Sequence, residues 1–248
     1  MKKFLLAGLL LGLMAFDGLA QRASRLRNFT EVGAGFQDKR GMGVLQFNQY
    51  LQIERRGVLQ VGWGGRGAFF SARDADFITA PARLTRGQSG FAALNAPLLL
   101  RNIDTLQMPR ATFTSFNFSL QIQISLFERL DIGVNTDLLG FTLGSRRTGF
   151  YLGSRGFSFV DSLNVHRTYQ TAVPTRGNLQ ILGGDNAHGS LNSEIYARLM
   201  LSQRVALKVS HIFNTSEYRT DKRLADDNRR FRLRSPMWYV ALCIPIYN

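Results

Sequence analysis

The strictest pattern in the sequence is an alternation of apolar and polar residues that runs from Ala111 to Phe127. Successive side chains of a β-strand point to opposite faces, so each kind of residue gathers on its own side. Soluble strands are usually about five or six residues long. The segment therefore predicts a long strand with an apolar face and a polar, uncharged face. The apolar face holds Phe116, Phe118, Leu120, Ile122, Ile124 and Leu126. The polar face holds Ser115, Asn117, Ser119, Gln121, Gln123 and Ser125.

Weaker versions of this alternation recur along the rest of the chain. Together with the first segment they predict eight strands, and an even number of strands returns both chain ends to one side. The predicted fold class is all-β, an antiparallel up-and-down barrel of about eight strands. The other seven segments are Phe29–Gln37, Gly43–Glu54, Val58–Phe70, Arg129–Leu143, Ser190–Ser202, Val205–Asn214 and Pro236–Tyr247.

The connections between these segments fall into two length classes. Short turns are expected at 55–57, 128–130 and 202–204, and long connections at 72–110, 144–189 and 217–235. The short connection at 38–41 is the exception among the long ones. Short turns at one rim and long loops at the other are typical of transmembrane barrels, whose chain ends lie on the short-turn, periplasmic side.

The N-terminal segment has the composition of a secretory signal peptide. Lys2 and Lys3 precede an apolar run, and Gly18-Leu19-Ala20 forms a small-x-small cleavage pattern. We therefore predict a cleaved signal peptide at 1–20 and a single domain at 21–248, since no linker or change of composition divides the remainder. The only cysteine, Cys243, excludes an intramolecular disulfide. No later stretch is long and apolar enough for a transmembrane helix.

With these features the chain resembles the small, eight-stranded outer-membrane β-barrel proteins of Gram-negative bacteria. The resemblance implies short periplasmic turns, long extracellular loops, residence in the cell outer membrane and contact with the barrel assembly machinery during biogenesis. A soluble barrel or sandwich with an apolar core is the alternative, because alternation alone does not say which face points inward. Aromatic girdles at the membrane surfaces are expected from Trp63, Phe69, Phe70, Phe141, Phe213, Tyr218, Trp238 and Tyr247.

An eight-stranded barrel has an interior just wide enough for side chains to fill. Charged residues enclosed there should pair, because an unpaired buried charge is costly. We expect a polar network that plugs the barrel, with an ion path or a catalytic carboxylate pair as alternatives. Its predicted members are Glu31, Glu54, Gln121, Gln123, Asp131, Asp137, Glu194, Arg198 and Lys208.

The formal net charge of +14 comes mostly from arginines in the long connections. Guanidinium groups suit phosphates and carboxylates, so we expect these loops to contact lipopolysaccharide or another anionic partner. Loops that are merely basic and solvated are the alternative. Nucleic acid is not an expected partner of an exported chain, and the sequence does not predict an oligomeric state. The anion-binding candidates are Arg146, Arg147, Arg223, Arg229 and Arg230.

Among the three histidines, only His211 has a distinctive position, on the apolar face of a predicted strand. The segment His211–Thr215 faintly resembles the His-x-Ser-Asn segment of outer-membrane lipid A deacylases. Phe213 stands at the serine position, so the nucleophile is absent. We predict a noncatalytic barrel with a structural or surface-binding role, without cofactor or metal. A lipid A-modifying hydrolase and a narrow channel are the alternatives.

Overall fold

The chain folds into a closed ring of eight antiparallel strands in a computed structural model. The structure describes residues 26–54, 57–88, 92, 96–126, 129–153, 159–160, 166–181, 189–224 and 227–246. The predicted signal peptide at 1–20 lies outside these residues. The eight strands are β1 (Leu26–Gln37), β2 (Arg40–Gln52), β3 (Leu59–Thr79), β4 (Thr105–Leu126), β5 (Leu130–Gly144), β10 (Ser190–Met200), β11 (Ala206–Arg219) and β12 (Arg230–Ile246).

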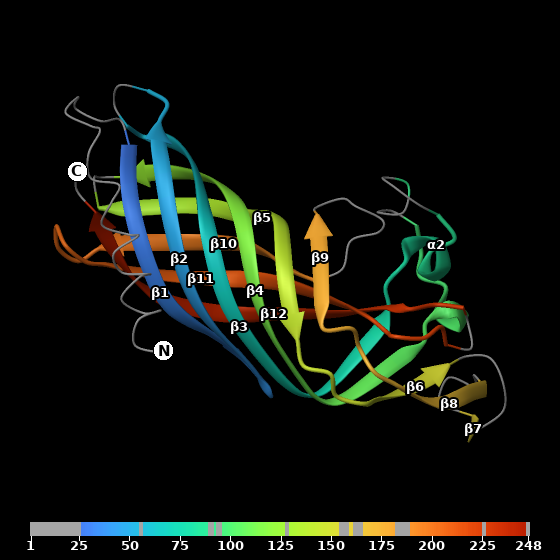
Figure 1. Cartoon of the computed structure of the whole chain (residues 1–248). Coiled ribbons are helices and arrows are strands. Elements are labelled where there is room, and N and C mark those ends of the chain that lie inside the picture. Colours follow the sequence, from blue (N-terminus) through green and yellow to red (C-terminus); the bar gives the residue numbers. More distant parts are fainter. Residues whose placement is uncertain are drawn as a thin grey trace, which may run out of the picture.

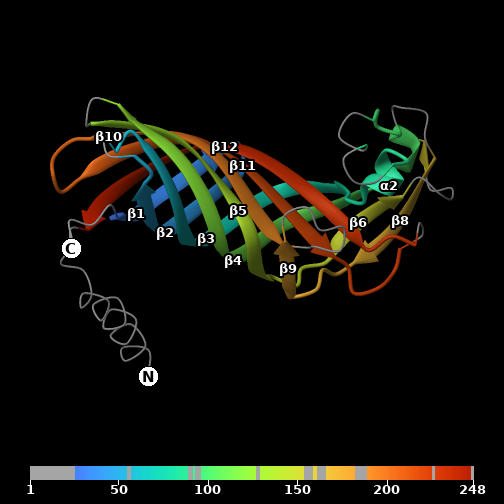
Figure 2. The same cartoon turned by 90° about the horizontal axis from the view of Figure 1, so that it is seen from above.

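Antiparallel pairing runs around the whole ring, and the first and last strands close it. β1 pairs with β12 from Asn28↔Ile246 to Phe36↔Trp238, and β5 pairs with β10 across the longest connection. A closed barrel leaves no unpaired sheet edge. The start of β1 and the end of β12 lie at one end of the barrel, while β6, β8 and α2 lie at the other (Figures 1 and 2). The predicted fold class is therefore confirmed.

Several strands are longer than predicted on the side opposite the chain ends. The expected connection at 72–110 is wrong at both of its ends, because β3 continues to Thr79 and β4 starts at Thr105. Asp74, with φ 48°, interrupts the ladder between Arg73↔Arg110 and Ala75↔Met108 without a change of register. The inward face passes from even-numbered to odd-numbered residues there, so Ala75 and Phe77 are buried beyond it. Between them lie α2 (Ala82–Thr85) and the 3-10 helix η1 (Leu100–Asn102).

The described part of the connection between β5 and β10 contains four further strands: β6 (Gly149–Gly153), β7 (Phe159–Val160), β8 (His166–Ala172) and β9 (Gly177–Ile181). β6 pairs with the start of β4 and with β8, while β9 pairs with the end of β5. The hairpin between β1 and β2 ends at Gln37↔Arg40, before β12 and β3 do. On the extension side of this hairpin, β12 therefore pairs directly with β3, at Arg232↔Ile78. We call residues 74–110, 145–181 and 217–232 the extension.

The outer surface of the ring carries an apolar band. Its aromatic members are partly exposed: Phe36, Phe47, Trp63, Phe69, Phe116, Phe118, Phe141, Phe213 and Trp238. Two residues expected in the girdles point inward instead, because Phe70 and Tyr218 are 1% and 2% exposed. Tyr247 lies outside the described residues. Among those described, no helix is long and apolar enough to cross a membrane.

On β2, β3 and β4 the inward side chains change from polar to apolar along the strand. On β2 the order from the chain-end side is Tyr50, Asn48 and Gln46, followed by Val44 and Met42. The same order holds on β4, where Gln123, Gln121, Ser119 and Asn117 are followed by Phe113 and Ala111. The barrel interior therefore has a polar half near the chain ends and, on these strands, an apolar half near the extension, while β10 and β11 keep buried polar residues such as Asn192 and Asn214 there.

Candidate functional site

The polar half of the interior is organised around Arg66, whose side chain is buried. Its Nη1 lies 3.1 Å from Asp137 Oδ1, and its Nη2 lies 2.8 Å from Glu194 Oε2. The Nε of Arg66 also donates to Gln46 Oε1 at 2.9 Å. Each nitrogen of the guanidinium fork thus has an acceptor, which is the geometry that favours a buried arginine.

Lys208 joins this group from the opposite wall. Its Nζ lies 2.7 Å from Glu194 Oε1 and 2.9 Å from Glu31 Oε1. The hydroxyl of Tyr239 donates to the same Glu31 oxygen at 2.8 Å. Glu194 therefore bridges two cations that come from β3 and β11. The interaction links strands that are not neighbours in the ring, so it fixes the cross-section of the barrel.

A second ion pair closes the interior nearer the chain ends. Arg198 donates from Nη2 to Asp131 Oδ2 at 2.7 Å and to Gln123 Oε1 at 2.8 Å. Its guanidinium lies 3.8 Å above the ring of Phe29, a cation-π contact that is strengthened by burial. Tyr50 packs edge-on against Phe29, at 5.8 Å between ring centroids. Arg198 and these aromatic rings fill the lumen at this level.

The enclosed charges are nearly balanced. The polar half of the interior encloses four buried carboxylates, Glu31, Asp131, Asp137 and Glu194, together with Arg66, Arg198 and Lys208. Arg27, at the rim, lies 4.0 Å from Asp131 and supplies a fourth cation. All four carboxylates have a cationic partner within 4.0 Å. A buried charge without a partner would be strongly destabilising, and the pairing removes this cost.

Most of the predicted interior residues come together in this network, and one does not. Gln121 accepts a hydrogen bond from the Tyr50 hydroxyl, and Gln123 accepts one from Tyr196 at 2.8 Å. The placement of Glu54 was wrong, because β2 ends at Gln52 and Glu54 is exposed in the turn that follows. Its Oε1 accepts from the backbone N–H of Leu59 at 3.2 Å. The carboxylate thus stabilises a turn outside the lumen.

The sequence interpretation missed Arg66, the centre of the network. This residue lies in the glycine-rich segment Gly62–Gly67, where glycines interrupt the alternation. One signal in the sequence could have found it. Arg66 is an even number of positions from the inward residue Gln60, and such residues lie on the same face of a strand. Gly64 is needed at its own position, since a Cβ there would lie 2.3 Å from the backbone oxygen of Phe47.

The apolar half of the interior is closed by aromatic rings. Phe70 and Phe113 stack with ring centroids 4.6 Å apart, and Tyr218 packs edge-on against Phe113 at 6.1 Å. Phe77 lies 5.0 Å from Tyr218 by the same measure. These side chains belong to one cluster of buried residues that continues into the extension through Leu106, Tyr151 and Phe231. On the extension side of the ion pairs, the lumen is therefore filled by this apolar cluster together with the buried polar residues Ser190, Asn192, Asn214 and Ser216 of β10 and β11.

The five anion-binding candidates lie on the extension, in different electrostatic settings. Three have carboxylate partners: Arg146 lies 3.7 Å from Asp221, Arg223 lies 2.5 Å from Asp227, and Arg230 lies 2.8 Å from Glu217. The pKa of the Arg223 guanidinium is raised by its hydrogen bond to Asp227. Arg147 is exposed and Arg229 is half-buried, and neither forms an ion pair with a described carboxylate.

His211 lies on the outer face of β11, between two aromatic rings of the apolar band. The imidazole packs edge-on against Phe213 at 4.7 Å and Trp238 at 5.2 Å between ring centroids. No hydrogen bond joins it to any other described side chain. Phe213 occupies the place of the serine in the deacylase segment, so the arrangement around His211 lacks the nucleophile and base pair that acyl transfer requires.

No protein-family model and no curated protein matches the chain. Among solved structures it is similar to Neisserial surface protein A, with 8% identity over 90% of this chain and 99% of that one, and a TM-score of 0.39. A major outer membrane protein from Thermus thermophilus shares 10% identity over 89% and 99% of the chains, with a TM-score of 0.41. The attachment invasion locus protein of Yersinia pestis shares 8% over 90% and 99%, with a TM-score of 0.34.

These TM-scores are low, and the architecture rests on the strand pairing of this chain. Eight antiparallel strands close through β1 and β12, and an apolar band surrounds them. An outward apolar band with a polar interior is the arrangement of transmembrane β-barrels. The chain has the architecture of the small bacterial outer-membrane β-barrel proteins.

Proposed function

We propose that this protein is a noncatalytic outer-membrane barrel with a closed lumen, which presents its basic extension to lipopolysaccharide or another anionic partner at the cell surface. The observation that carries the proposal is the contrast between the two ends of the molecule. Charges in the interior are compensated, whereas exposed guanidinium groups collect on the extension. The barrel thus acts as a rigid support for a cationic surface.

The filled interior favours a supporting role over a channel. Two successive barriers lie along the barrel axis, the ion-paired network around Arg66 and Glu194 and the aromatic core around Phe113. An ion crossing the first would have to displace buried ion pairs, and crossing the second would require it to shed its water. The expected conductance in a planar bilayer is therefore that of the bare membrane.

The arginines of the extension favour an anionic partner. Glu217 and Asp221 neutralise some of them, but Arg147 and Arg229 keep guanidinium groups without a carboxylate partner among the described residues. A cationic surface raises the local concentration of anionic ligands and is sensitive to salt. Lipopolysaccharide meets this description, since it covers the face to which the long loops of an outer-membrane barrel project.

The proposal is tested with the full-length protein folded in phosphatidylcholine nanodiscs and titrated with purified lipopolysaccharide. The double variant Arg147→Gln/Arg229→Gln is expected to lower the affinity roughly threefold to tenfold, since exposed charges contribute about 0.2–1 kcal/mol each. The matched control is Arg129→Gln/Arg204→Gln, which removes the same charge from the short-turn end. This control is expected to bind as the wild type does.

Binding that is absent from the wild-type protein, or lowered equally by both double variants, would contradict the proposed role of the extension. A reproducible unitary conductance from the same preparation would contradict the closed lumen. Lipopolysaccharide binding and conductance are measured independently. The first therefore tests the role of the extension, and the second tests the closed lumen.

A further inference from the structure

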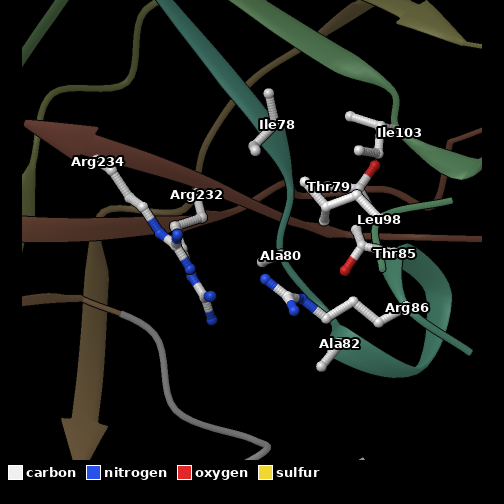
Figure 3. A pocket seen from close by; sticks show the side chains of 10 residues that line it. All are labelled: Ile78, Thr79, Ala80, Ala82, Thr85, Arg86, Leu98, Ile103, Arg232 and Arg234. Atoms are coloured by element: carbon white, nitrogen blue, oxygen red, sulfur yellow. The ribbon is translucent and has the colours of Figure 1, made fainter. Parts of the chain in front are cut away.

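A pocket opens on the outer wall where the extension joins the barrel and β12 runs beside β3. Its volume is about 90 Å³. The lining residues come from β3, α2, the segment before β4, and β12 (Figure 3). They are Ile78, Thr79, Ala80, Ala82, Thr85, Arg86, Leu98, Ile103, Arg232 and Arg234, and we call this site the arginine pocket.

The arginine pocket is rich in positive charge. The guanidinium groups of Arg86, Arg232 and Arg234 point toward one another in Figure 3. Arg232 donates from Nε to Glu217 at 2.6 Å, and this carboxylate is shared with Arg230. Arg234 forms no ion pair with any described carboxylate. The lining residues themselves include three guanidinium groups and no carboxylate.

The positive charges of the pocket act directly on the Arg234 guanidinium. Its side chain is partly buried against the wall, and the positive charges of Arg232 and Arg86 lie nearby. Burial, followed by these like charges, lowers the pKa of the Arg234 guanidinium below its usual value. An anion bound between the three groups would relieve the repulsion. Arg86 donates from Nη1 to Ala96 O at 2.5 Å and Arg232 is paired with Glu217, so Arg234 is the group whose parallel N–H donors are best placed for the oxygens of a phosphate group.

The second feature of the pocket is an apolar rim. Leu98, which lines the pocket, begins a run of three leucines, Leu98, Leu99 and Leu100, that are 50%, 42% and 57% exposed. The run is held in place by α2, because the N–H of Leu99 donates to Thr85 O at 2.7 Å and Asn102 Nδ2 donates to Leu84 O at 3.0 Å. A fixed cluster of exposed leucines usually marks a binding surface.

The position of the pocket is consistent with a ligand in the lipid phase. Arg234 lies four residues from Trp238 on the same strand, β12. At about 3.3 Å per residue this is roughly 13 Å along the strand, beyond the edge of the apolar band. The pocket thus lies on the outer wall of the barrel, on the headgroup side of that band.

We propose that the arginine pocket binds the phosphate group of a phosphorylated lipid, with the leucine run in contact with the apolar part next to it. The pocket volume of about 90 Å³ leaves room for a small polyatomic group such as a phosphate. The inference rests on the proposed role of the extension as an anion-binding surface. It names the arginine pocket as one binding site and a lipid phosphate as its ligand.

The test uses the full chain folded in detergent micelles and titrated with dihexanoyl phosphatidic acid. Inorganic phosphate and dihexanoyl phosphatidylcholine serve as comparison ligands. Arg234→Gln is expected to lower the affinity for the phosphatidic acid roughly tenfold or more, because a hydrogen bond to a charged group contributes about 1.5–3 kcal/mol. Leu98→Ser is expected to lower it as well, without changing the binding of inorganic phosphate. Arg110→Gln, an exposed arginine of the extension that does not line the pocket, is the matched control.

Each of the other outcomes overturns a stated part of the proposal. Inorganic phosphate bound as tightly as phosphatidic acid would assign the pocket to a soluble anion. Equal losses from Arg234→Gln and Arg110→Gln, or no binding by wild type, would exclude the pocket as the site. If Arg234→Gln retains phosphatidic acid binding while wild type binds lipopolysaccharide, the pocket fails and the proposed function stands. If wild type binds no lipopolysaccharide, the proposed function itself fails.

Discussion

Replacing Arg66 with methionine is expected to lower the free energy of unfolding of the barrel by about 3–5 kcal/mol. The substitution keeps a long, unbranched side chain and removes its charge, which leaves Asp137 and Glu194 buried with fewer cationic partners. Removing one member of a buried ion pair leaves an uncompensated charge, and costs of this size are typical. The measurement is urea unfolding of the protein folded in phosphatidylcholine vesicles, followed by the fluorescence of Trp63 and Trp238.

The control for this substitution is Arg73→Met on the same strand. Arg73 is exposed on the outer side of β3, so its replacement is expected to change the free energy of unfolding by less than about 1 kcal/mol. Arg66→Lys should fall between the two, since lysine keeps the charge but lacks the fork that reaches both carboxylates. Equal effects at positions 66 and 73 would show that Arg66 is not the centre of an enclosed network.

Replacing Phe113 with alanine is expected to lower the free energy of unfolding by about 3–5 kcal/mol, the range found for buried phenylalanines. The ring stacks on Phe70 and packs against Tyr218, so its removal opens a cavity in the apolar half of the lumen. The same vesicle-based unfolding measurement applies. Conductance should stay at the level of the bare membrane, because the ion-paired network below this cavity remains in place.

Phe116→Ala provides a control from the outer face of the same strand. Phe116 is 57% exposed and belongs to the outer apolar band, whereas Phe113 is 3% exposed. A ring that faces lipid loses little on truncation, because lipid tails fill the space that it leaves. The expected change is therefore less than half of that at Phe113. A larger loss of stability from Phe116→Ala than from Phe113→Ala would contradict the assignment of Phe113 to the inward face of β4 and of Phe116 to the outward face.

The sequence predicts the barrel because its lipid-facing and enclosed residues differ in character over most of the height. In β4, six apolar residues alternate with Ser, Asn and Gln, and this period of two identifies both faces. The same alternation assigns four charged members of the network to the inward face, because each is next to an apolar residue on the other face. They are Asp131, Glu194, Arg198 and Lys208. These residues could therefore be assigned to the interior before the pairing of the strands was known.

Other features do not show in the alternation. On β3 both faces are apolar toward the extension, as at Phe69 and Phe70, so the period of two disappears and the strand was predicted to end too early. Arg66 was missed because glycines surround it, and Glu54 was misplaced because parity cannot tell where a strand ends and its turn begins. The arginine pocket combines β3, α2 and β12, and such contacts between distant segments depend on the three-dimensional fold.

The central claim is that this chain forms a closed barrel in the outer membrane. Its most direct test is the electrophoretic mobility of the full-length protein, extracted from the outer-membrane fraction of a Gram-negative host and loaded in SDS with and without boiling. A closed barrel held by backbone pairing around the whole ring resists SDS until it is heated, so the unboiled protein should migrate as a compact form that disappears on boiling. Recovery of the protein from the soluble periplasmic fraction, with the same mobility before and after boiling, would contradict the membrane barrel.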